Sequence, residues 1–205
     1  MRPRRKCIPE VTYHCQSRCV ELRDLFAQRL AKKIAIKVIR KTLEKYSFEL
    51  IFLEFVQNHF HLIIRTVDDG ATVSLIMQYI KSRIAEQYNE KVDRTGPFWN
   101  ERFRSDIIEE YENPQRALLY LIWKISYNLV RKGVIRNPRE SEYGTIRAHL
   151  DRNYTPKVKI TLHRFFLNLG QSFEECVREF LCYEQLYLRH HPPLEQKGSE
   201  PAEKL

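Results

Sequence analysis

The sequence lacks the features that place a protein in a membrane or a secretory pathway. Its 205 residues contain no apolar run of about 18, the length that a spanning helix needs. The basic segment Met1–Lys6 has no apolar stretch behind it, so it does not resemble a secretory signal. We therefore expect no membrane partner and a cytoplasmic location, associated at most with a bacterial nucleoid.

Cysteine is scarce and unsuitably spaced for cross-linking or metal binding. The five cysteines are an odd number, and neither Cys15 with Cys19 nor Cys176 with Cys182 has the CxxC spacing of a zinc knuckle. This usage argues against a disulfide scaffold. The sequence thus predicts reduced, partly buried thiols.

Basic residues exceed acidic ones in this chain. Lys and Arg number 35 against 26 Asp and Glu, which gives a formal net charge of +9 at pH 7. Such a balance favours a polyanionic partner, and nucleic acid is the commonest one. We interpret residues 1–10, which contain Arg2, Arg4, Arg5 and Lys6, as a basic arm for nonspecific phosphate binding.

Hydrophobic periodicity predicts an α+β fold for residues 11–135, which we assign as one domain. The predicted elements are a strand at 11–18, a helix at 22–45, strands at 48–57 and 59–66, a helix at 72–89, an extended segment at 98–108 and a helix from Asn113 to Gly133. Elements in this order form a ferredoxin-like antiparallel sheet with helices on one face.

The remaining chain is predicted to add helices. A connecting loop at 136–157 leads to helical patterns at 158–169 and 172–190, and Ser172 with Glu175 forms a capping box for the second. We expect residues 158–190 to form a C-terminal helical appendage. The polar, proline-containing residues 191–205 are predicted to be a disordered tail.

The sharpest chemical feature is His59-Phe60-His61, in the strand predicted at 59–66. Side chains two apart on a strand share a face, so both imidazoles can reach one metal ion while Phe60 packs into the core. The neutral imidazole, which is available at pH 7, is the form that ligates metals. Taken alone, a His-x-His pattern is short, and two hydrogen-bonded or surface histidines are its commoner explanation.

Four segments in register resemble the single-tyrosine HUH transposases, including the REP-associated tyrosine transposases. They are Tyr13-His-Cys-Gln-Ser-Arg18, Phe55-Val-Gln-Asn-His-Phe-His-Leu-Ile-Ile64, Gly96-Pro-Phe-Trp-Asn-Glu-Arg-Phe-Arg-Ser105 and Asn128-Leu-Val-Arg-Lys-Gly133. The resemblance spans roughly residues 8–135. The resemblance therefore implies that residues 11–135 are an HUH transposase-like catalytic domain.

This resemblance implies metal-dependent DNA transposition and recombination. In the family, a tyrosine on a helix attacks a phosphodiester of single-stranded DNA, forming a 5′-phosphotyrosine link and freeing a 3′-hydroxyl. Two histidines and a polar residue on that helix hold Mg²⁺ or Mn²⁺, which polarises the scissile phosphate. Carried onto this sequence, the metal ligands are His59, His61 and Asn128. A homodimer is also implied, since in related enzymes the tyrosine helix of one subunit can serve the other's site.

The sequence departs from the family at the nucleophile. The family's tyrosine lies four residues before the third metal ligand, on the same helix face, and here that position is Lys124. A protonated lysine is a poor nucleophile toward a phosphodiester but can hold a phosphate electrostatically. Tyr120 lies one turn earlier on nearly the same face. We therefore assign Tyr120 and Lys124 as the catalytic candidates.

Other tyrosines and other functions stay open. Tyr127 points about 100° around the helix from the third ligand, and Tyr111 lies outside the helix. Tyr187 has His191 at the required spacing, but in the appendage. The rival function is a catalytically inactive, domesticated DNA-binding module, which Lys124 would mark. A third is a nuclease in which water replaces the tyrosine.

The remaining candidates combine charge with an aromatic face. Arg18, Trp99, Arg102 and Arg104 are suited to phosphate contact and base stacking, as a single-strand or hairpin site requires. Core packing is the competing role for Trp99, and a solvated sheet edge is the competing role for the arginines. The predicted partner is single-stranded or hairpin DNA.

Overall fold

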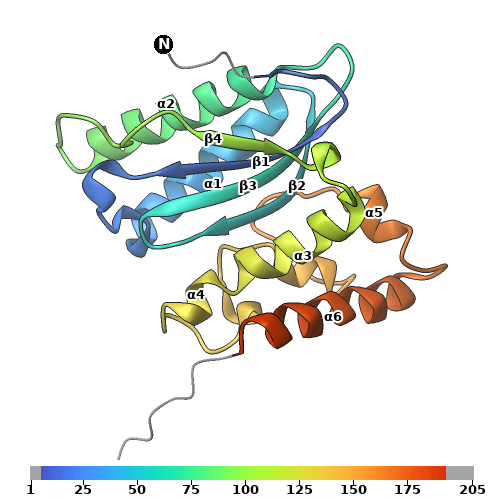
Figure 1. The fold of residues 1–205 in the computed structure, drawn as a ribbon. Helices are drawn as coiled ribbons and strands as arrows, with labels where there is room; N and C mark the ends of the chain where they lie inside the picture. The colour runs from blue at the N-terminus through green and yellow to red at the C-terminus, as the bar shows by residue number, and fades with distance from the viewer. Residues whose placement is uncertain (1–5, 193–205) are drawn as a thin grey trace, which may run out of the picture.

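A four-stranded antiparallel sheet organises the chain (Figure 1). The structure is a computed structural model that describes residues 6–192. The strands are β1 (Thr12–Arg18), β2 (Phe48–Phe55), β3 (His59–Thr66) and β4 (Arg104–Ile107). They lie in the order β2-β3-β1-β4, and each neighbouring pair is antiparallel. The predicted α+β fold with a ferredoxin-like antiparallel sheet is confirmed, whereas the prediction that its helices lie on one face is wrong, because the helix Pro114–Ser126 packs on the face opposite the helices Arg29–Lys45 and Val73–Lys91.

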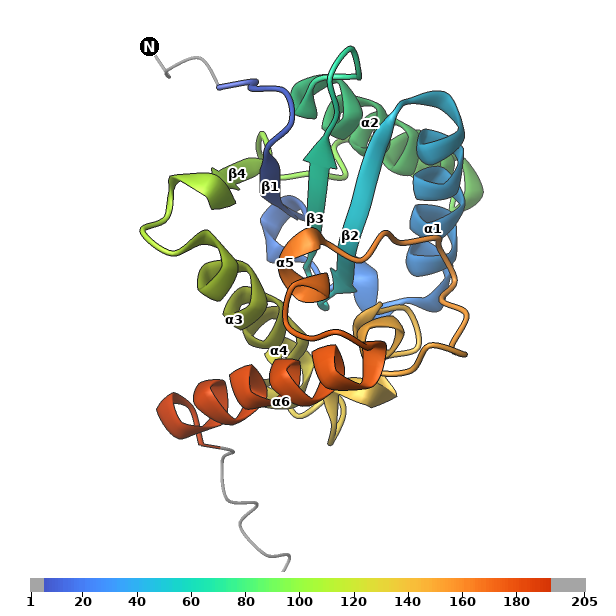
Figure 2. The same cartoon turned by 90° about the vertical axis from the view of Figure 1, so that its right-hand side faces the viewer.

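Helices cover both faces of this sheet. They are α1 (Arg29–Lys45), α2 (Val73–Lys91), α3 (Pro114–Ser126), α4 (Asn128–Arg131), α5 (Arg164–Leu167) and α6 (Phe173–His190). Figure 2 shows α1 and α2 on one side of the sheet and α3, α5 and α6 on the other. Phe166 of α5 and Phe180 of α6 share an apolar cluster with Phe52 of β2 and Ile63 of β3. The C-terminal helices therefore form a layer on the second face.

The alternation of side chains along β3 separates the two cores. Phe60, Leu62 and Ile64 lie in the cluster under α1 and α2, whereas Ile63 lies in the cluster under α3 and α6. Apolar residues at helical spacing complete the first cluster, namely Ala31, Ile34, Ala35, Val38 and Ile39 of α1 and Val73, Ile76, Met77, Ile80 and Ile84 of α2. The histidines of β3 consequently point to the second face.

The helix predicted at 22–45 begins later, at Arg29, so the predicted start is wrong. The apolar Leu25 and Phe26 belong to a short 3-10 turn instead. The backbone N–H of Phe26 donates to the carbonyl of Gln57, at the hairpin between β2 and β3, with an N···O distance of 2.8 Å. A tertiary contact thus overrides the helical spacing in this segment.

The segment predicted to be extended over 98–108 is a strand only at β4. Before it, Trp99 forms a single isolated β-bridge with Cys19, which does not extend into a longer ladder. After β4, residues Ile108–Glu110 form a 3-10 turn that leads to α3. The edge strand is therefore short.

The helix predicted from Asn113 begins as expected but does not run unbroken to Gly133. The Asn113 side chain accepts from the N–H of Arg116 at 2.9 Å, and Pro114 is the first helical residue. At Tyr127, φ is −78° and ψ is −3°, which stay in the right-handed helical region but depart from ideal α-helix values, and here α3 ends and α4 begins. Gly133 follows with φ +67°, a conformation that suits glycine.

Of the helix expected at 158–169, only the short helix α5 forms, because the residues before α5 run along β2. The N–H of Thr161 donates to the carbonyl of Leu50 at 2.7 Å. The loop expected at 136–157 also lies against β2, where the N–H of Thr145 donates to the carbonyl of Leu53 at 3.0 Å. These hydrogen bonds use the outer edge of β2, which periodicity does not reveal.

The helix expected at 172–190 is α6. The hydroxyl of Ser172 accepts from the N–H of Glu175 at 3.1 Å, as a capping residue does. The carboxylate of Glu175 accepts from the N–H of Gln171 at 2.7 Å. In this capping box, the carboxylate of Glu175 thus caps the backbone N–H of Gln171, the residue before Ser172.

Two predicted segments fall largely outside the described residues. Arg2, Arg4 and Arg5 of the predicted arm lie there, as do residues 193–205 of the predicted tail. Lys6 is described, and its ammonium lies 2.6 Å from the carboxylate of Glu110. Over residues 6–192, no helix combines the length and the apolar composition that crossing a membrane requires.

Candidate functional site

Polar side chains form a row on the second face of the sheet, beside α3 and α4. Strand pairing places His61 opposite Gln16 of β1 on one side and Glu54 of β2 on the other. It also places Arg18, at the end of β1, opposite His59. Since alternate residues of a strand share a face, the two histidines point the same way, and the residue between them is buried in the other core.

His59 is half-buried and neutral. Burial, with the positive charges of Lys132 and Arg18, lowers the pKa of His59 to about 4. Its Nδ1 lies 2.7 Å from the Oδ1 of Asn58. Because an amide oxygen only accepts, Nδ1 carries the hydrogen and the lone pair is on Nε2. Asn58 thereby selects the tautomer that can ligate a metal through Nε2.

His61 lies between a third histidine and an amide. It is 6% exposed, and burial holds its pKa well below the usual value. Its Nδ1 lies 2.9 Å from the Nε2 of His14, and the two rings stack with their centroids 5.2 Å apart. Its Nε2 lies 3.4 Å from the amide nitrogen of Asn128. The Nδ1 of His14 faces the carboxylate of Asp106 at 3.7 Å.

Asn128, His61, His14 and Asp106 form a chain of polar contacts, and the two end groups determine which ring nitrogens carry hydrogen. The amide nitrogen of Asn128 only donates, so His61 accepts at Nε2 and donates from Nδ1 to the Nε2 of His14. His14 then carries its hydrogen on Nδ1, toward the carboxylate of Asp106. An imidazole oriented through its far nitrogen is the usual arrangement of a metal-ligating histidine.

Asn128 connects the histidines to the C-terminal layer. Its Oδ1 accepts from Arg131 at 2.6 Å, and Arg131 also donates to the hydroxyl of Tyr187 on α6. The break at Tyr127 makes Asn128 the first residue of α4. A metal requires the amide oxygen, not the nitrogen, to face His61. Ligation therefore needs this amide to turn over and to release Arg131.

Two imidazoles, together with the Asn128 amide once it has turned over, could hold a divalent metal. The rings of His59 and His61 are close to perpendicular, with their centroids 4.9 Å apart, and both keep their lone pair on Nε2. Between residues 6 and 192, His, Cys, Asp and Glu form no group of three or more that could hold a metal ion. A metal here would thus depend on Asn128 and on oxygens of phosphate or water.

Lys124 lies closer to this site than Tyr120 does. Lys124 is exposed on α3, one turn before Asn128, and its charge is among those that lower the pKa of His61. Tyr120 lies two turns before Asn128, about 12 Å along a helix axis at 1.5 Å per residue. The ring of Tyr120 packs against that of Tyr187, with the centroids 5.7 Å apart.

The other candidate tyrosines are engaged elsewhere. Tyr127 donates its hydroxyl to Glu184 at 2.8 Å, and burial raises its pKa. The hydroxyl of Tyr187 accepts from Arg131. Tyr111 precedes α3 and is 49% exposed. In the described part of the chain, no tyrosine hydroxyl forms a hydrogen bond with either histidine of β3.

The predicted DNA-binding residues separate into two groups. Arg18 and Arg104 lie on the histidine face of the sheet, and Arg102 is exposed just before β4. Trp99 is packed, since its indole N–H donates to the carbonyl of Lys81 at 2.8 Å and its ring contacts the aromatic core. The structure thus gives the three arginines access to solvent and gives Trp99 the packing role that competed with base stacking.

A buried carboxyl lies beside His61 on β2. The Oε1 of Glu54 accepts from the hydroxyl of Ser141 at 2.8 Å, whereas its Oε2 is buried and has no hydrogen-bond partner among residues 6–192. Burial raises the pKa of Glu54 to about 8, so the carboxyl is protonated at neutral pH. A Cβ at Gly144 would lie 2.3 Å from this Oε2, so any larger residue there would displace the Glu54 carboxyl.

Sequence reasoning missed His14 and Glu54 as parts of this site. His14 lies in the segment Tyr13–Arg18 that resembles the family, but no role is assigned to it there, and Glu54 of the strand predicted at 48–57 lies outside the four segments. His14 pairs with Ile63 across the strands and reaches His61 diagonally. Only the pairing register brings these side chains to His61, and a single sequence does not specify that register.

Residues 7–120 match the family described as "Transposase IS200 like". The match covers more than half of the chain and includes β1, β2, β3 and both of their site histidines. The chain belongs to the IS200-like transposase family. The matched region ends before Lys124 and Asn128. The IS200-like assignment therefore rests on the sheet and its first helices.

Solved structures resemble this IS200-like transposase. One is the structure of a REP-associated tyrosine transposase bound to a REP hairpin, with a TM-score of 0.60, 18% identity, and coverage of 78% of this chain and 92% of that chain. Another is a Deinococcus radiodurans R1 protein described as a transposase, with a TM-score of 0.39, 17% identity, and coverage of 59% and 94%. None of the curated proteins matches. The first of these likenesses shows that the two folds agree.

Proposed function

We propose that this IS200-like transposase binds single-stranded or hairpin DNA at its histidine face, with a divalent metal against a phosphate. Two neutral imidazoles on one face, both with the lone pair on Nε2 and both beside Arg18, carry this proposal. The net charge of +9 suits a polyanion. The REP-associated transposase that the fold resembles has a hairpin bound.

Each residue of the site has a separate task in this proposal. His59, His61 and Asn128 would hold Mg²⁺ or Mn²⁺, which supplies charge stabilisation to a phosphodiester when bound. Asn58 and His14 hold the two rings in the ligating tautomer. Lys124 and Arg18 contribute positive charge to neighbouring phosphates.

Removing both His59 and His61 tests the proposed metal site. The His59→Ala/His61→Ala double variant is expected to lose Mn²⁺ binding in calorimetric titration at neutral pH, since one amide ligand alone holds a divalent ion poorly. The matched control is His190→Ala/His191→Ala, which removes two exposed histidines at the end of α6. Equal Mn²⁺ binding by wild type and by the double variant at β3 would contradict the metal site.

Strand cleavage is one chemical outcome of such a site. The family resemblance implies cleavage and rejoining through a phosphotyrosine, and in this chain Tyr120 would supply the nucleophile. The bond from its Oη to phosphorus forms while the bond from phosphorus to the 3′ oxygen breaks, and that oxygen leaves as a hydroxyl. This chemistry would support transposition and recombination.

The geometry favours DNA binding without this step. Lys124 occupies the position of the family's tyrosine, and Tyr120 lies a further turn away from Asn128, packed on Tyr187. A homodimer would not change this spacing, because Tyr120 and Asn128 lie on the consecutive helices α3 and α4 of one subunit. We therefore propose DNA binding as the activity that this site supports best, and cleavage by Tyr120 as the second candidate.

One assay separates these candidates. Labelled hairpin DNA with an unpaired flank is incubated with the protein and Mn²⁺, then denatured and resolved by electrophoresis. We expect binding and no adduct that survives denaturation. An adduct that is lost in Tyr120→Phe and kept in Tyr46→Phe, a change on the α1–α2 side, would establish phosphotyrosine chemistry instead. Cleaved DNA without an adduct would identify water as the nucleophile.

A further inference from the structure

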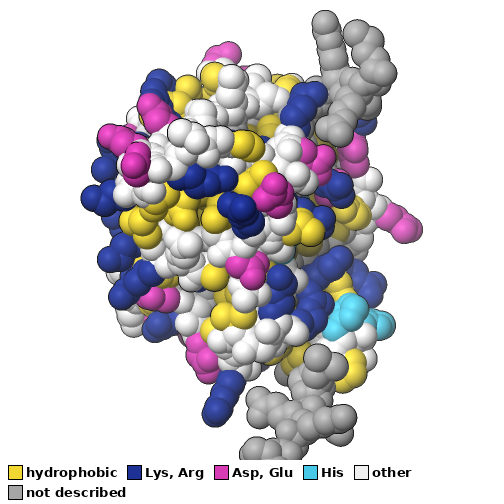
Figure 3. Space-filling view, turned by 90° about the vertical axis from the view of Figure 1, so that its left-hand side faces the viewer, with side chains coloured by type: hydrophobic (Ala, Val, Ile, Leu, Met, Phe, Trp, Pro, Cys, Tyr) yellow, Lys and Arg dark blue, Asp and Glu magenta, His cyan; other side chains and the backbone are white. Residues whose placement is uncertain are grey.

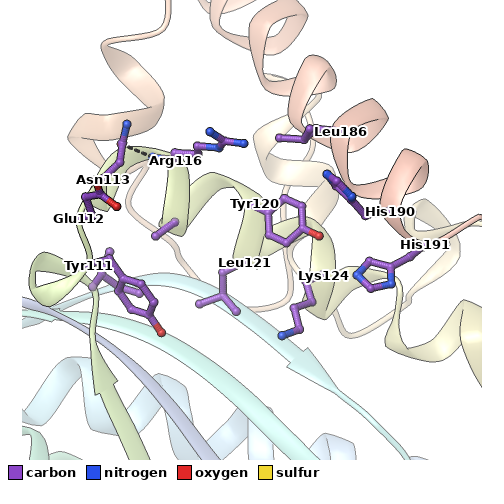
Figure 4. Close-up of a pocket in the computed structure, with 12 residues that line it drawn as sticks. Tyr111, Glu112, Asn113, Arg116, Tyr120, Leu121, Lys124, Leu186, His190 and His191 are labelled. Carbon is purple, nitrogen blue, oxygen red and sulfur yellow. Dashed lines mark hydrogen bonds between the residues drawn. The ribbon is translucent and has the colours of Figure 1, made fainter.

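A cavity between the start of α1 and the segment that follows α4 has no task in the function proposed above. It has a volume of about 260 Å³ and is lined by the first turn of α1, the end of β2 and residues of the segment 134–143. A larger cleft of about 700 Å³ lies between α3 and α6 and is lined by other residues, among them Tyr120 and Lys124 (Figure 4). The smaller cavity is therefore a separate site.

Lys32 supplies the cavity with a positive charge that is not paired. Its side chain is half-buried, and among residues 6–192 its ammonium has neither a hydrogen bond nor an ion pair within 4 Å. The Nζ lies 5.7 Å from the centre of the Tyr143 ring, and burial lowers the pKa of Lys32. An ammonium carries three N–H donors. The cavity therefore contains donors that lack an acceptor.

The buried carboxyl of Glu54 is a second lining group without a full set of partners. Its Oε1 accepts from the hydroxyl of Ser141 at 2.8 Å and from the N–H of Phe55 at 3.0 Å, whereas its Oε2 has no partner in the described part of the chain. Because this carboxyl is protonated at neutral pH and Oε1 accepts twice, the hydrogen lies on Oε2. A buried donor without an acceptor destabilises the fold. An oxygen of a ligand in the cavity would satisfy it.

The other charged groups of the lining already have partners. Arg29 donates to the carboxylate of Glu142 at 3.0 Å. That carboxylate also lies 3.3 Å from the ammonium of Lys157, and the carboxylate of Glu140 accepts from a backbone N–H at 3.0 Å. Lys32 is thus the charged side chain of the lining that remains available to a ligand. A divalent metal ion does not fit here, since the available charge is positive.

The rest of the lining is apolar and limits the size of the ligand. Phe55, Leu129 and Ile135 line the cavity and are buried or half-buried. The volume of about 260 Å³ lies just below the range of about 300–1,000 Å³ that encloses drug-sized molecules. Seen from the side on which α1 begins, the surface carries many Lys and Arg side chains, which favours the approach of an anion (Figure 3). The cavity therefore suits a compact anion.

We propose that this cavity binds a small carboxylate with a compact apolar body. Its oxygens accept from Lys32 and Glu54, and its body packs on the three apolar side chains of the lining. A carboxylate fits better than a phosphate, because one available cation balances a single negative charge and the apolar side chains cannot solvate a second one. This site is independent of the DNA-binding site proposed above.

Benzoate is the probe that tests this cavity, because it joins one carboxylate to a compact apolar ring. Calorimetric titration at neutral pH compares it with benzamide, which has the same ring without the charge, and with inorganic phosphate, which has charge without the ring. Wild type is expected to bind benzoate about tenfold more tightly than either, as one hydrogen bond to a charged group provides. Benzoate at about ten times its Kd should also raise the Tm by roughly 3–6 °C.

Three variants separate the cavity from binding at the surface. Lys32→Met keeps the stem of the side chain and removes its charge, so the affinity for benzoate should fall about tenfold. Lys33→Met removes an exposed charge at the next residue, outside the lining, and should bind benzoate as wild type does. Ile135→Trp fills the cavity and should lose both the binding and the rise in Tm.

Each outcome decides for or against the cavity. Equal affinity of wild type and Lys32→Met for benzoate would overturn the proposal, and so would a folded wild type that does not bind benzoate. Tighter binding of phosphate than of benzoate would overturn it as well, since the site would then select charge without the apolar body. None of these results bears on the proposed DNA binding, which is tested with metal and DNA.

Discussion

Replacing Lys124 by tyrosine is expected to give this protein a covalent adduct with flanked hairpin DNA in the presence of Mn²⁺. The family places its nucleophile one turn before the third ligand, and Lys124 occupies that position with its side chain exposed. A tyrosine there would restore the missing hydroxyl on the face that Asn128 shares. We expect the amount of adduct to rise from none to a readily detected level. Denaturing electrophoresis measures the adduct, and mass spectrometry of the digested protein locates it.

Two further variants separate the hydroxyl from other effects of this change. Lys124→Phe has nearly the same volume as the tyrosine variant and lacks the hydroxyl, so it should give no adduct. Adding His61→Ala to Lys124→Tyr should abolish the adduct, since the phosphate would lose its metal. A Lys124→Tyr protein that binds DNA tightly without an adduct would show that the nucleophile is not the only missing part. The hydrogen bond from Arg131 to Asn128 would then be the next obstacle to examine.

Replacing Glu54 by glutamine is expected to stabilise the protein increasingly as the pH rises. Burial raises the pKa of Glu54 from its usual 4.5 to about 8 in the folded state. The folded chain therefore keeps a proton that the unfolded chain releases above pH 4.5. The contribution of Glu54 to stability is complete below that pH and is lost as the pH rises to 8, at up to about 1.4 kcal/mol per unit. Glutamine resembles the protonated acid and has no proton to lose.

Urea denaturation at pH 5, 6.5 and 8 measures this effect. The variant and wild type should have similar free energies of unfolding at pH 5, and the variant should be more stable by roughly 2–4 kcal/mol at pH 8. The buried histidines titrate equally in both proteins, so the difference isolates Glu54. Glu49→Gln, the same change at a half-exposed position of β2, should leave the pH dependence as it is in wild type. A constant difference across the three pH values would contradict the raised pKa.

The local patterns of this sequence were sufficient for most of the architecture. Alternation placed β3 at 59–66 and put both histidines on one face, because the period of a strand is two. Asn113-Pro114 marked the start of α3 through the capping chemistry of its side chain. This order of strands and helices is compatible with few sheet topologies, and the structure has the ferredoxin-like one.

The failures share a physical cause, which is dependence on distant partners. The 3-10 turn at Phe26 is held by Gln57, and the extended residues before α5 are held by Leu50. The contact of His14 with His61 depends on strand register in the same way. Neither periodicity nor spacing contains such information, because both describe neighbours along the chain.

The hydrogen bonds from Tyr187 through Arg131 to Asn128 tie the chemistry of the sheet to α6. Helix α6 lies outside residues 7–120, the part of the chain that matches the family model. The amide proposed to complete the metal site is thus oriented by a helix that the family model does not include. Substitutions along α6 can then retune how firmly a strand is held, while the histidine platform stays as it is.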